Sequence, residues 1–377
     1  MISTPPSPKH DVIFRVDASI DIGTGHVMRC LTLADMLSNF GFACRFVCRD
    51  HPGNMMRLIR QRGFAVSELP RPQEQPECHA GEPAHSHWLG VDWHTDARQT
   101  LSAIGRVSAA WLIVDHYALD WRWERFLRPS IQHLMVVDDL ADREHCCELL
   151  CDQSLGRSAA DYKLLVPSDC QLLVGARYAL LRPQFLGKRS YSLARRRDAE
   201  PRRLLVTLGG VDKDNITERV LCSLYGCALP KDTDITVVMG AHAPWLDAVR
   251  GRAARMPWKT RVVSNVDDMA ALMSDADLAI GAAGGTSWER CALGVPTVMM
   301  VLAENQREIA GNLASAGAAR IVELGADFGD EVRKAVERLF ADKPTRDIMS
   351  DRAAAICDGA GGLDVARHVA GRIARHG

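Results

Sequence analysis

The sequence predicts an α/β protein with two domains, each a parallel β-sheet covered by helices. Apolar runs of strand length alternate with helix-like segments, which is typical of βαβ units. The alternation occurs in two series, one over residues 11–155 and another beginning at residue 202, with a polar stretch between them. A chain of 377 residues with 47 % hydrophobic content is also long enough to bury two ordinary cores.

The first domain is expected over residues 11–183, after a loose tail at residues 1–10 that is rich in Ser and Pro. Its strands appear as short β-branched and aromatic runs, and its helices as segments with apolar residues at helical spacing. The expected strands cover residues 11–18, 42–49, 64–69, 110–117 and 133–140, and the expected helices cover residues 26–40, 54–62 and 95–107, followed by a short Trp-rich helix.

Residues 184–203 are the expected linker, because this stretch lacks apolar periodicity and carries a basic run. The run Arg195–Arg197 is compatible with a phosphate contact, but a solvated linker is the favoured interpretation. The second domain is expected over residues 204–377, and its last helix either stays there or returns to the first domain. Its strands are expected at residues 202–210, 234–240, 260–266, 277–285, 296–302 and 319–325.

The composition argues against several classes of protein. A formal net charge of −1 predicts no broad attraction to nucleic acid or to an acidic membrane. The longest apolar runs fall far short of the roughly 20 residues that a membrane span needs. The twelve cysteines are scattered through apolar segments, without a CxxC pair or a secretory leader. A reduced, cytoplasmic protein without stable membrane association is therefore expected.

A Pro-rich stretch near residues 70–87 is the one place with a cluster of metal-binding residue types. Imidazoles and a thiolate suit zinc, but their spacing here fits no standard ligand pattern, so an exposed, variable insertion is the favoured interpretation. The residues concerned are Cys78, His79, His85 and His87.

The most informative motif, residues 20–37, combines a strand end, a glycine turn and a helix start with His26. Gly23 and Gly25 permit positive φ and close backbone approach, so the turn offers N–H groups to an anion or a sugar hydroxyl. The positive end of the helix disfavours protonation of His26, and Arg29, one turn later, is expected to lower its pKa further. A neutral imidazole there has the profile of a general base. The alternative is a helix-start histidine that merely bonds to the backbone.

The stretch DLAIGAAGGTSWERCALG repeats this arrangement in the second domain. An apolar strand ends in Gly284 and Gly285, and the next helix is expected to begin at Thr286 or Ser287, so the turn suits the diphosphate of a nucleotide. Glu289 has two interpretations of equal weight. It closes a capping box with Thr286, or it accepts hydrogen bonds from a ribose diol.

Further candidates follow other strands of the second domain. Asn305 and Gln306 come after one apolar run, and Gly209 and Gly210 end another, so these residues are expected at carboxyl ends of strands, where open α/β sheets bind ligands. If the two domains face each other, their glycine turns line one cleft. A diphosphate site in one domain and a histidine in the other favour a nucleotide-sugar enzyme of the GT-B architecture.

Six ordered motifs carry a resemblance to a known family: DASIDIGTGHVMRCLTLA, VDHYALD, VVDDLADR, YALLRPQF, VTLGGVD and GAAGGTSWERCALGVPTV. They resemble those of the UDP-2,4-diacetamido-2,4,6-trideoxy-β-L-altropyranose hydrolases of pseudaminic acid biosynthesis. These enzymes are relatives of the GT-B glycosyltransferases, but they transfer the sugar to water instead of to another hydroxyl. The resemblance implies that His26 is the water-activating base and that Tyr117 and Asn305 lie near the substrate. It also implies that Gly284–Ser287 face UDP and that Glu289 contacts the ribose.

The implied reaction is hydrolysis of a UDP-sugar to free sugar and UDP, in which activated water attacks the anomeric carbon and inverts it. Neither a cofactor nor a metal is expected. No DxD-like cluster lies beside either glycine turn, and Asp138 and Asp139 are as suited to capping or to pairing with Arg143.

Two alternatives stay open. The first is a GT-B glycosyltransferase in which His26 deprotonates an acceptor hydroxyl, and the lesser one is a non-catalytic nucleotide-sugar-binding protein. In each case the expected partner is a small UDP-sugar, and neither nucleic acid nor a membrane is expected.

Overall fold

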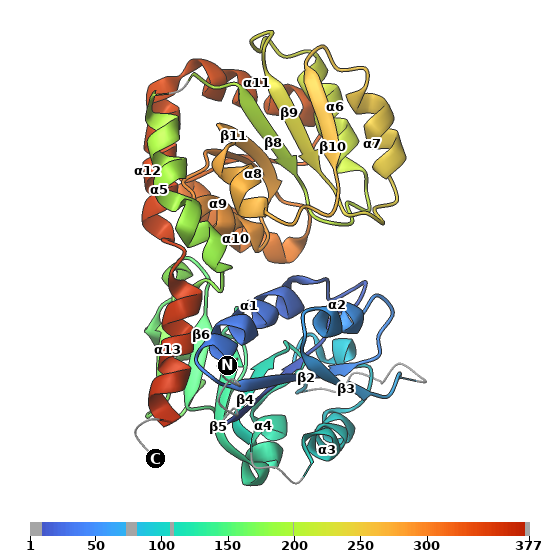
Figure 1. Ribbon diagram of the computed structural model, residues 1–377, viewed down its shortest axis with the longest axis vertical. Coiled ribbons are helices and arrows are strands. Elements are labelled where there is room, and N and C mark those ends of the chain that lie inside the picture. The colour runs from blue at the N-terminus through green and yellow to red at the C-terminus, as the bar shows by residue number, and fades with distance from the viewer. Residues whose placement is uncertain (1–9, 73–80, 106–108, 199, 374–377) are drawn as a thin grey trace, which may run out of the picture. The chain divides into compact units, whose positions relative to one another are not determined.

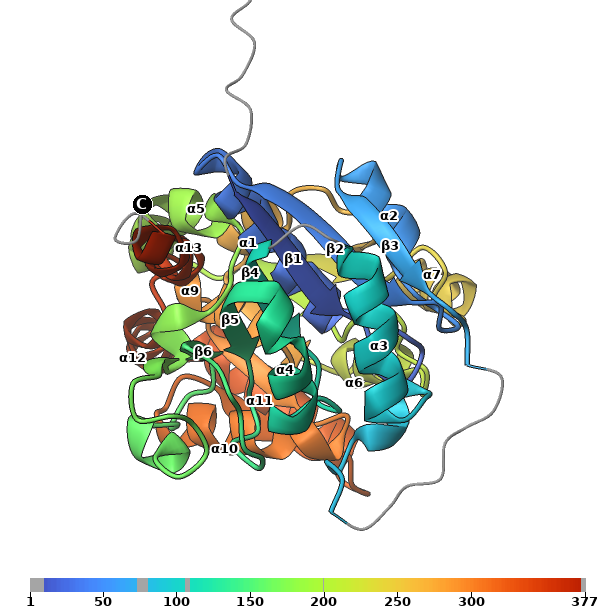
Figure 2. The same ribbon diagram turned by 90° about the horizontal axis from the view of Figure 1, so that it is seen from below.

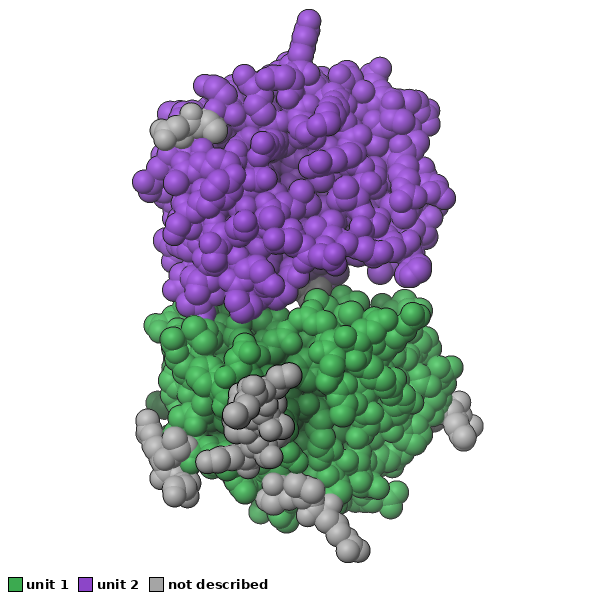
Figure 3. Space-filling model, in the orientation of Figure 1, with its two compact units in different colours: residues 1–180, 361–377 green, residues 181–360 purple. Residues whose placement is uncertain are grey.

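The computed structural model describes residues 10–72, 81–105, 109–198 and 200–373. The chain forms two compact units (Figure 1, Figure 3). Unit 1 combines residues 1–180 with residues 361–377, and unit 2 is residues 181–360. The last helix therefore belongs with the beginning of the chain, which is one of the two arrangements that the sequence left open.

Unit 1 is built on a sheet of seven strands in the order β3-β2-β1-β4-β5-β6-β7. Every neighbouring pair is parallel, as the continuous apolar runs predict. The order reverses between β1 and β4, which pair directly although β2 and β3 separate them along the chain. The strands are β1 (Asp11–Val16), β2 (Ala43–Arg49), β3 (Ala65–Leu69), β4 (Ala109–Asp115), β5 (Ile131–Val137), β6 (Leu149–Asp152) and β7 (Gln171–Val174).

Helices cover both faces of this sheet, because successive strand residues point to opposite sides. Val12 and Phe14 of β1 belong to a core with α1, α2 and α13, whereas Ile13 between them packs in a second core with α3 and α4. Figure 2 shows α3 and α4 in front of the strands. The helices are α1 (Gly25–Asn39), α2 (Met56–Gln61), α3 (Trp93–Ile104), α4 (Trp121–Leu127) and α13 (Gly361–Ile373), with 3₁₀ turns η1 (Ser86–Leu89), η2 (Arg128–Ser130), η3 (Ala159–Tyr162) and η4 (Ala176–Tyr178).

Unit 2 has a parallel sheet of six strands in the order β10-β9-β8-β11-β12-β13. The strand order again reverses between the first strand and the fourth, here β8 and β11. The strands are β8 (Arg203–Thr207), β9 (Asp234–Val238), β10 (Lys259–Val263), β11 (Leu278–Ala282), β12 (Thr297–Met300) and β13 (Arg320–Val322).

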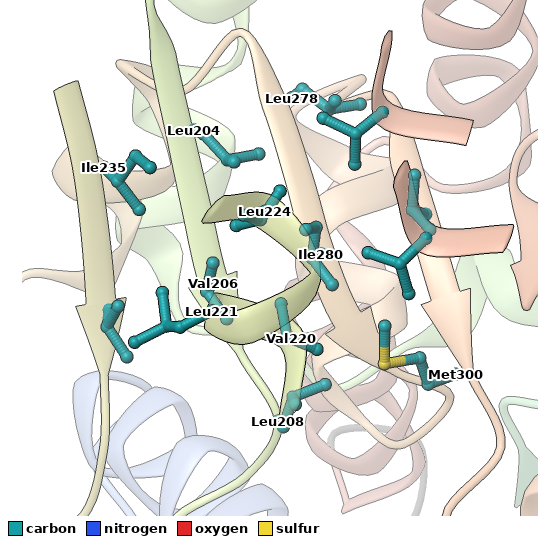
Figure 4. Packing of buried hydrophobic residues seen from close by; sticks show 14 of the residues in the cluster. Leu204, Val206, Leu208, Val220, Leu221, Leu224, Ile235, Leu278, Ile280 and Met300 are labelled. Atoms are coloured by element: carbon teal, nitrogen blue, oxygen red, sulfur yellow. The ribbon is translucent and has the colours of Figure 1, made fainter. Parts of the chain in front are cut away.

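The core of unit 2 joins this sheet to α6 and its neighbours. Leu204 and Val206 of β8 and Ile280 of β11 pack with Leu221 and Leu224 of α6 (Figure 4). Burying a side chain of this size contributes about 1.5–3 kcal/mol, so such a cluster binds helix and sheet tightly. The helices are α5 (Pro183–Asp198), α6 (Ile216–Tyr225), α7 (Leu246–Ala253), α8 (Met269–Ser274), α9 (Thr286–Ala292), α10 (Arg307–Ser315), α11 (Phe328–Ala341) and α12 (Lys343–Ile356), with the 3₁₀ turn η5 (Glu304–Gln306).

Most of residues 184–203, expected as an irregular and solvated linker, form helix α5. That expectation was wrong, because the arginines of α5 bind unit 2. Arg189 donates to the carbonyls of Ala292 and Ala354 at 2.5 and 2.7 Å. Arg196, 8 % exposed, donates to the carbonyl of Ala276 at 2.9 Å. These carbonyls lie at helix ends, where arginine satisfies backbone groups that have no partner within the helix.

Across the described residues, no helix is both long and apolar enough to span a bilayer.

Candidate functional site

His26 lies in the first turn of α1, directly after the loop that follows β1. Ser19 shapes this loop, since its hydroxyl accepts from the backbone N–H of Ile22 at 2.9 Å. Gly23 turns the chain with a φ of +80°, a conformation that favours glycine. The backbone N–H groups of Gly25 and His26 have no hydrogen-bond partner among the described residues. This helix start is therefore open to a ligand.

A buried carboxylate fixes the imidazole of His26. Its Nδ1 lies 2.6 Å from Oδ1 of Asp115, the last residue of β4. Burial by itself would raise the pKa of Asp115, but the charge of Arg29 and the hydrogen bonds that Arg29 and His26 donate outweigh it and hold that pKa well below its usual range. Because an ionised carboxylate only accepts hydrogen bonds, Nδ1 carries the proton and donates it. Nε2 keeps its lone pair and bonds to none of the described residues, so it is free to accept a proton.

Arg29 holds this carboxylate in turn. Its Nε and Nη2 donate to the two oxygens of Asp115 at 2.6 and 2.7 Å, which is a bidentate pair. Its Nη1 donates to Oδ2 of Asp139 at 2.5 Å. The guanidinium expected to bind substrate is thus engaged by two carboxylates, so Arg29 supports the partner of His26.

Tyr117, two residues after Asp115, contacts the ring of His26. The ring centroids are 4.6 Å apart and the planes meet at 83°, an edge-to-face contact. The Tyr117 hydroxyl donates to Oδ2 of Asp139 at 2.7 Å. Burial, followed by the charge of Asp139, raises the pKa of Tyr117 well above its usual value, so the phenol stays neutral.

Trp88 and His85 continue this aromatic surface. Trp88 stacks on Tyr117 with centroids 5.8 Å apart and planes at 24°, and the ring of His85 lies 4.4 Å from that of Trp88. The stretch that contains them was expected to be an exposed insertion. At its described end that expectation holds for His87, which is exposed, but not for His85 and Trp88, which are half-buried and contact the ring of Tyr117. Cys78 and His79 lie outside the described residues.

The glycine turn of unit 2 presents consecutive N–H groups. It connects β11 to α9, which begins at Thr286. The N–H groups of Gly284, Gly285 and Thr286 have no hydrogen-bond partner among the described residues. A methyl group added to either glycine would meet no atom within 4 Å, so the turn faces open space. Successive N–H groups of this kind attract anions.

Side chains after this turn behave differently from the expectation. The capping box of Thr286 and Glu289 does not form, because the Thr286 hydroxyl accepts from Arg290 at 3.1 Å and no side chain caps α9. Ser287 is 1 % exposed, and its hydroxyl also accepts from Arg290, so this side chain supports the turn from within. Burial raises the pKa of Glu289, whose carboxylate lies 3.8 Å from Arg182. Its contact with a ribose stays a prediction.

The turn after β8 is less favourable to an anion. Gly209 adopts a φ of +102°, and Gly210 follows it. Asp212 then caps the N-terminus of α6, because its carboxylate accepts hydrogen bonds from the N–H groups of Ile216 and Thr217 at 2.9 and 2.8 Å. A carboxylate there satisfies the helix start and repels a second anion. Of the two glycine turns, the one before α9 is therefore better suited to a diphosphate.

Asn305 and Gln306 lie in η5, after β12. The side-chain oxygen of Gln306 accepts from the backbone N–H of Leu302 at 2.9 Å, so it holds the chain beyond that strand. The side chain of Asn305 lies outside the described part of the structure. The candidate residues of unit 2 thus follow three neighbouring strands, β8, β11 and β12, at one edge of the sheet.

Sequence reasoning missed the residues that support His26. Asp115 lies near the end of a predicted strand, two residues before Tyr117, and this place marked it as one of several candidate carboxylates without singling it out. Asp138 pairs with Arg143 at 2.9 Å, one of the two roles expected for it. In the part of the chain that the structure describes, no three His, Cys, Asp or Glu side chains are grouped to hold a metal ion.

The two parallel α/β units have the GT-B fold. Residues 203–360 match the glycosyltransferase family 28 C-terminal domain. MurG of Acinetobacter baumannii superposes with a TM-score of 0.69 at 15 % identity, over 96 % of this chain and 99 % of that one. The calicheamicin glycosyltransferase CalG4 superposes with a TM-score of 0.63 at 16 % identity, over 97 % and 98 %.

Among curated proteins, the UDP-2,4-diacetamido-2,4,6-trideoxy-beta-L-altropyranose hydrolase of Campylobacter jejuni is 24 % identical over 81 % of this chain and 97 % of its own length. This confirms the resemblance predicted from the motifs. The spore coat polysaccharide biosynthesis protein SpsG of Bacillus subtilis is 30 % identical over 53 % of this chain. The uncharacterized protein MJ1062 of Methanocaldococcus jannaschii is 26 % identical over 78 % of it. The chain spans only 58 % and 56 % of the lengths of these last two relatives.

Proposed function

We propose that this protein hydrolyses a UDP-linked 2,4-diacetamido-2,4,6-trideoxy sugar to free sugar and UDP, a reaction of pseudaminic acid biosynthesis. The observation that carries the proposal is the His26–Asp115 pair. It leaves a free, proton-accepting Nε2 where strand order reverses in unit 1. The likeness to the Campylobacter hydrolase along nearly its whole length supports the same conclusion.

In the proposed reaction, water attacks the anomeric carbon as the bond from that carbon to the UDP oxygen breaks. Nε2 of His26 takes the proton that water loses, and Asp115 balances the imidazolium that forms. The bonding electrons leave with UDP, which departs as an anion and needs no proton from an acid. Attack from the side opposite UDP inverts the anomeric centre.

Unit 2 supplies the site for the leaving group in this proposal. The free N–H groups of Gly284, Gly285 and Thr286 bind the diphosphate, and Glu289 accepts from the ribose. In unit 1 the rings of Tyr117 and Trp88 adjoin the base and offer the sugar an apolar surface. Such a surface suits a deoxy sugar with acetamido methyl groups.

A GT-B glycosyltransferase is the second candidate, favoured by the match of residues 203–360 to glycosyltransferase family 28. In that case Nε2 of His26 would deprotonate an acceptor hydroxyl in place of water. The two reactions differ in whether UDP is released when no acceptor is present.

The test is to incubate purified protein with the UDP-linked diacetamido trideoxy sugar alone and to measure UDP release. We expect turnover by the wild type and a loss of about 100-fold or more in His26→Ala, because general-base catalysis contributes on that order. In ¹⁸O-labelled water the label should appear in the sugar and not in UDP. Absence of UDP release without an acceptor would exclude the hydrolase, and full activity of His26→Ala would exclude His26 as the base.

A further inference from the structure

A buried arginine lies within the glycine turn of unit 2. Arg290 of α9 is 1 % exposed, although its guanidinium carries a charge. No ion pair found among the described residues includes it. Burial lowers the pKa of Arg290 to about 10, which still leaves the guanidinium charged at neutral pH. A buried charge that makes no ion pair is costly to a folded protein unless hydrogen bonds compensate for its lost hydration.

The hydrogen bonds of Arg290 tie the two ends of the turn together. Nη2 donates to the carbonyl of Ala282 at 2.7 Å and to the hydroxyl of Ser287 at 3.1 Å. Nη1 donates to the hydroxyl of Thr286 at 3.1 Å, while Nε is buried and has no partner. A methyl group on Gly281 would come within 2.4 Å of Nη1. The strand therefore needs glycine at that place to admit the guanidinium.

These bonds have two consequences for the face of the turn. They hold the backbone in the conformation that leaves the N–H groups of Gly284, Gly285 and Thr286 without a protein partner. Because the Thr286 hydroxyl accepts from Arg290, its own hydrogen remains available to a further acceptor. The positive charge of the guanidinium also adds to the field of these N–H groups.

We propose that Arg290 is a positioning residue for the diphosphate of the bound nucleotide, holding the turn in its anion-accepting form and supplying the positive charge behind it. This inference rests on the proposed function, in which the same turn binds UDP. Arg290 does not touch the ligand. It acts through Thr286 and through the backbone of the turn.

The experiment measures the affinity of the full-length protein for UDP and for uridine by calorimetry, without turnover. Arg290→Gln removes the charge, and Arg290→Lys keeps it but loses the forked geometry. We expect Arg290→Gln to weaken UDP binding by about 10- to 100-fold, as for loss of charge-assisted hydrogen bonding, while uridine binding stays unchanged. Arg290→Lys should restore part of the loss.

Arg196 provides the matched control, because it too is a buried arginine of unit 2 that donates to backbone carbonyls. Burial likewise lowers its pKa to about 10. Arg196→Lys should leave the ratio of UDP to uridine affinity as in the wild type. Thr286→Val, which keeps the shape of the side chain, should weaken UDP binding and carries the test if Arg290→Gln fails to fold.

The outcomes separate the two proposals. Equal UDP affinity in wild type and Arg290→Gln, or an equal loss of uridine affinity, would overturn the role of Arg290. Wild-type protein that binds UDP but releases none from the UDP-sugar would overturn the hydrolase and leave the role of Arg290 standing.

Discussion

Asp115 decides which nitrogen of His26 is available to accept a proton, so at the scale of single residues it matters as much as His26. Its Oδ1 accepts a hydrogen bond from Nδ1–H of His26, with 2.6 Å between the two heavy atoms, and the carboxylate is itself held by two nitrogens of Arg29. The imidazole is thereby fixed in one tautomer and one orientation. In the proposed hydrolysis, a base held in this way would need no rearrangement when water arrives.

Replacing Asp115 with Asn removes the negative charge while it keeps the shape of the side chain. The amide can offer either its NH₂ group or its oxygen to His26, so the tautomer is no longer fixed. We expect kcat for UDP release to fall by about 100-fold or more with a smaller change in KM. Steady-state kinetics over a range of pH provide the measurement, since the profile also shifts when the imidazolium loses its counter-charge.

Asp142→Asn is the control for this change, because that side chain is 41 % exposed and pairs with Arg143. Its kcat should stay near the wild-type value. A kcat and a pH profile of Asp115→Asn equal to those of the wild type would contradict the role of Asp115.

The sequence allowed His26 to be predicted but not its partner, because the partner is distant along the chain. A histidine after a glycine turn is a local pattern, visible within a few residues. Asp115 lies 89 residues further along the chain and meets His26 only because β1 pairs with β4. Asp17, Asp115 and Asp139 all follow or end strands of this sheet, so strand ends alone do not identify which carboxylate reaches the imidazole.

Among the elements, α13 completes a core of unit 1 from the far end of the described chain. Its Val365, Ala366 and Val369 are fully buried in the core that contains the apolar face of α1. Its His368 also meets Gln171 of β7 at 2.9 Å between side-chain nitrogens. The helix therefore covers α1, the element that carries His26.

The double substitution Val365→Ala and Val369→Ala tests this packing. Removing buried methyl groups opens cavities, so we expect the free energy of unfolding to fall by about 2–4 kcal/mol. Urea unfolding followed by circular dichroism measures the change. Arg367→Ala on the same helix, with a side chain that is 61 % exposed, should change stability little. Equal effects of the two variants would contradict the packing role of α13.

At the scale of the whole molecule, buried acidic groups are distributed unevenly between the units. In unit 1 the pKa values of four buried carboxylates lie below their usual range, because neighbouring charges, chiefly those of arginines, outweigh the effect of burial. In unit 2 the described carboxylate with a lowered pKa is Asp342, whose carboxylate caps α12. The four carboxylates of unit 1 are Asp17, Asp96, Asp115 and Asp138.

Acid should therefore open unit 1 before unit 2. A carboxylate whose pKa is lower in the folded state contributes stability above its unfolded pKa of about 4, and this stability is lost as the pH falls further. Asp152 acts in the opposite sense, because burial and the charge of Asp139 raise its pKa to about 6. As the pH falls from 6 to about 4, the folded state takes up this proton before the unfolded state does, so the free energy of unfolding of unit 1 rises slightly. Pulsed hydrogen exchange read by mass spectrometry reports each unit separately.

Asp152→Asn is the matched variant for this experiment. It should abolish the gain between pH 6 and about 4 and leave the loss at lower pH in place. Unit 2 peptides that lose protection at the same pH as unit 1 peptides, or at a higher one, would contradict the prediction.

The two parallel sheets were predictable because long apolar runs such as those of β4 and β8 alternate with helical segments. The strands β6 and β7 were not predicted, since each has four residues and a 3₁₀ turn, η3, is the helical element between them. The alternation of strand and helix that predicted the other strands is absent there. The place of α13 was left open for a similar reason, because its apolar stripe is compatible with either sheet.

The return of α13 to unit 1 sets the order in which the protein can mature on the ribosome. Residues 181–360 emerge as an unbroken block, so unit 2 can fold as soon as it clears the exit tunnel. Unit 1 begins earlier but must wait, its first helix uncovered, until Gly361–Ile373 has also emerged from the tunnel. The domain that starts first is thus the one that finishes last.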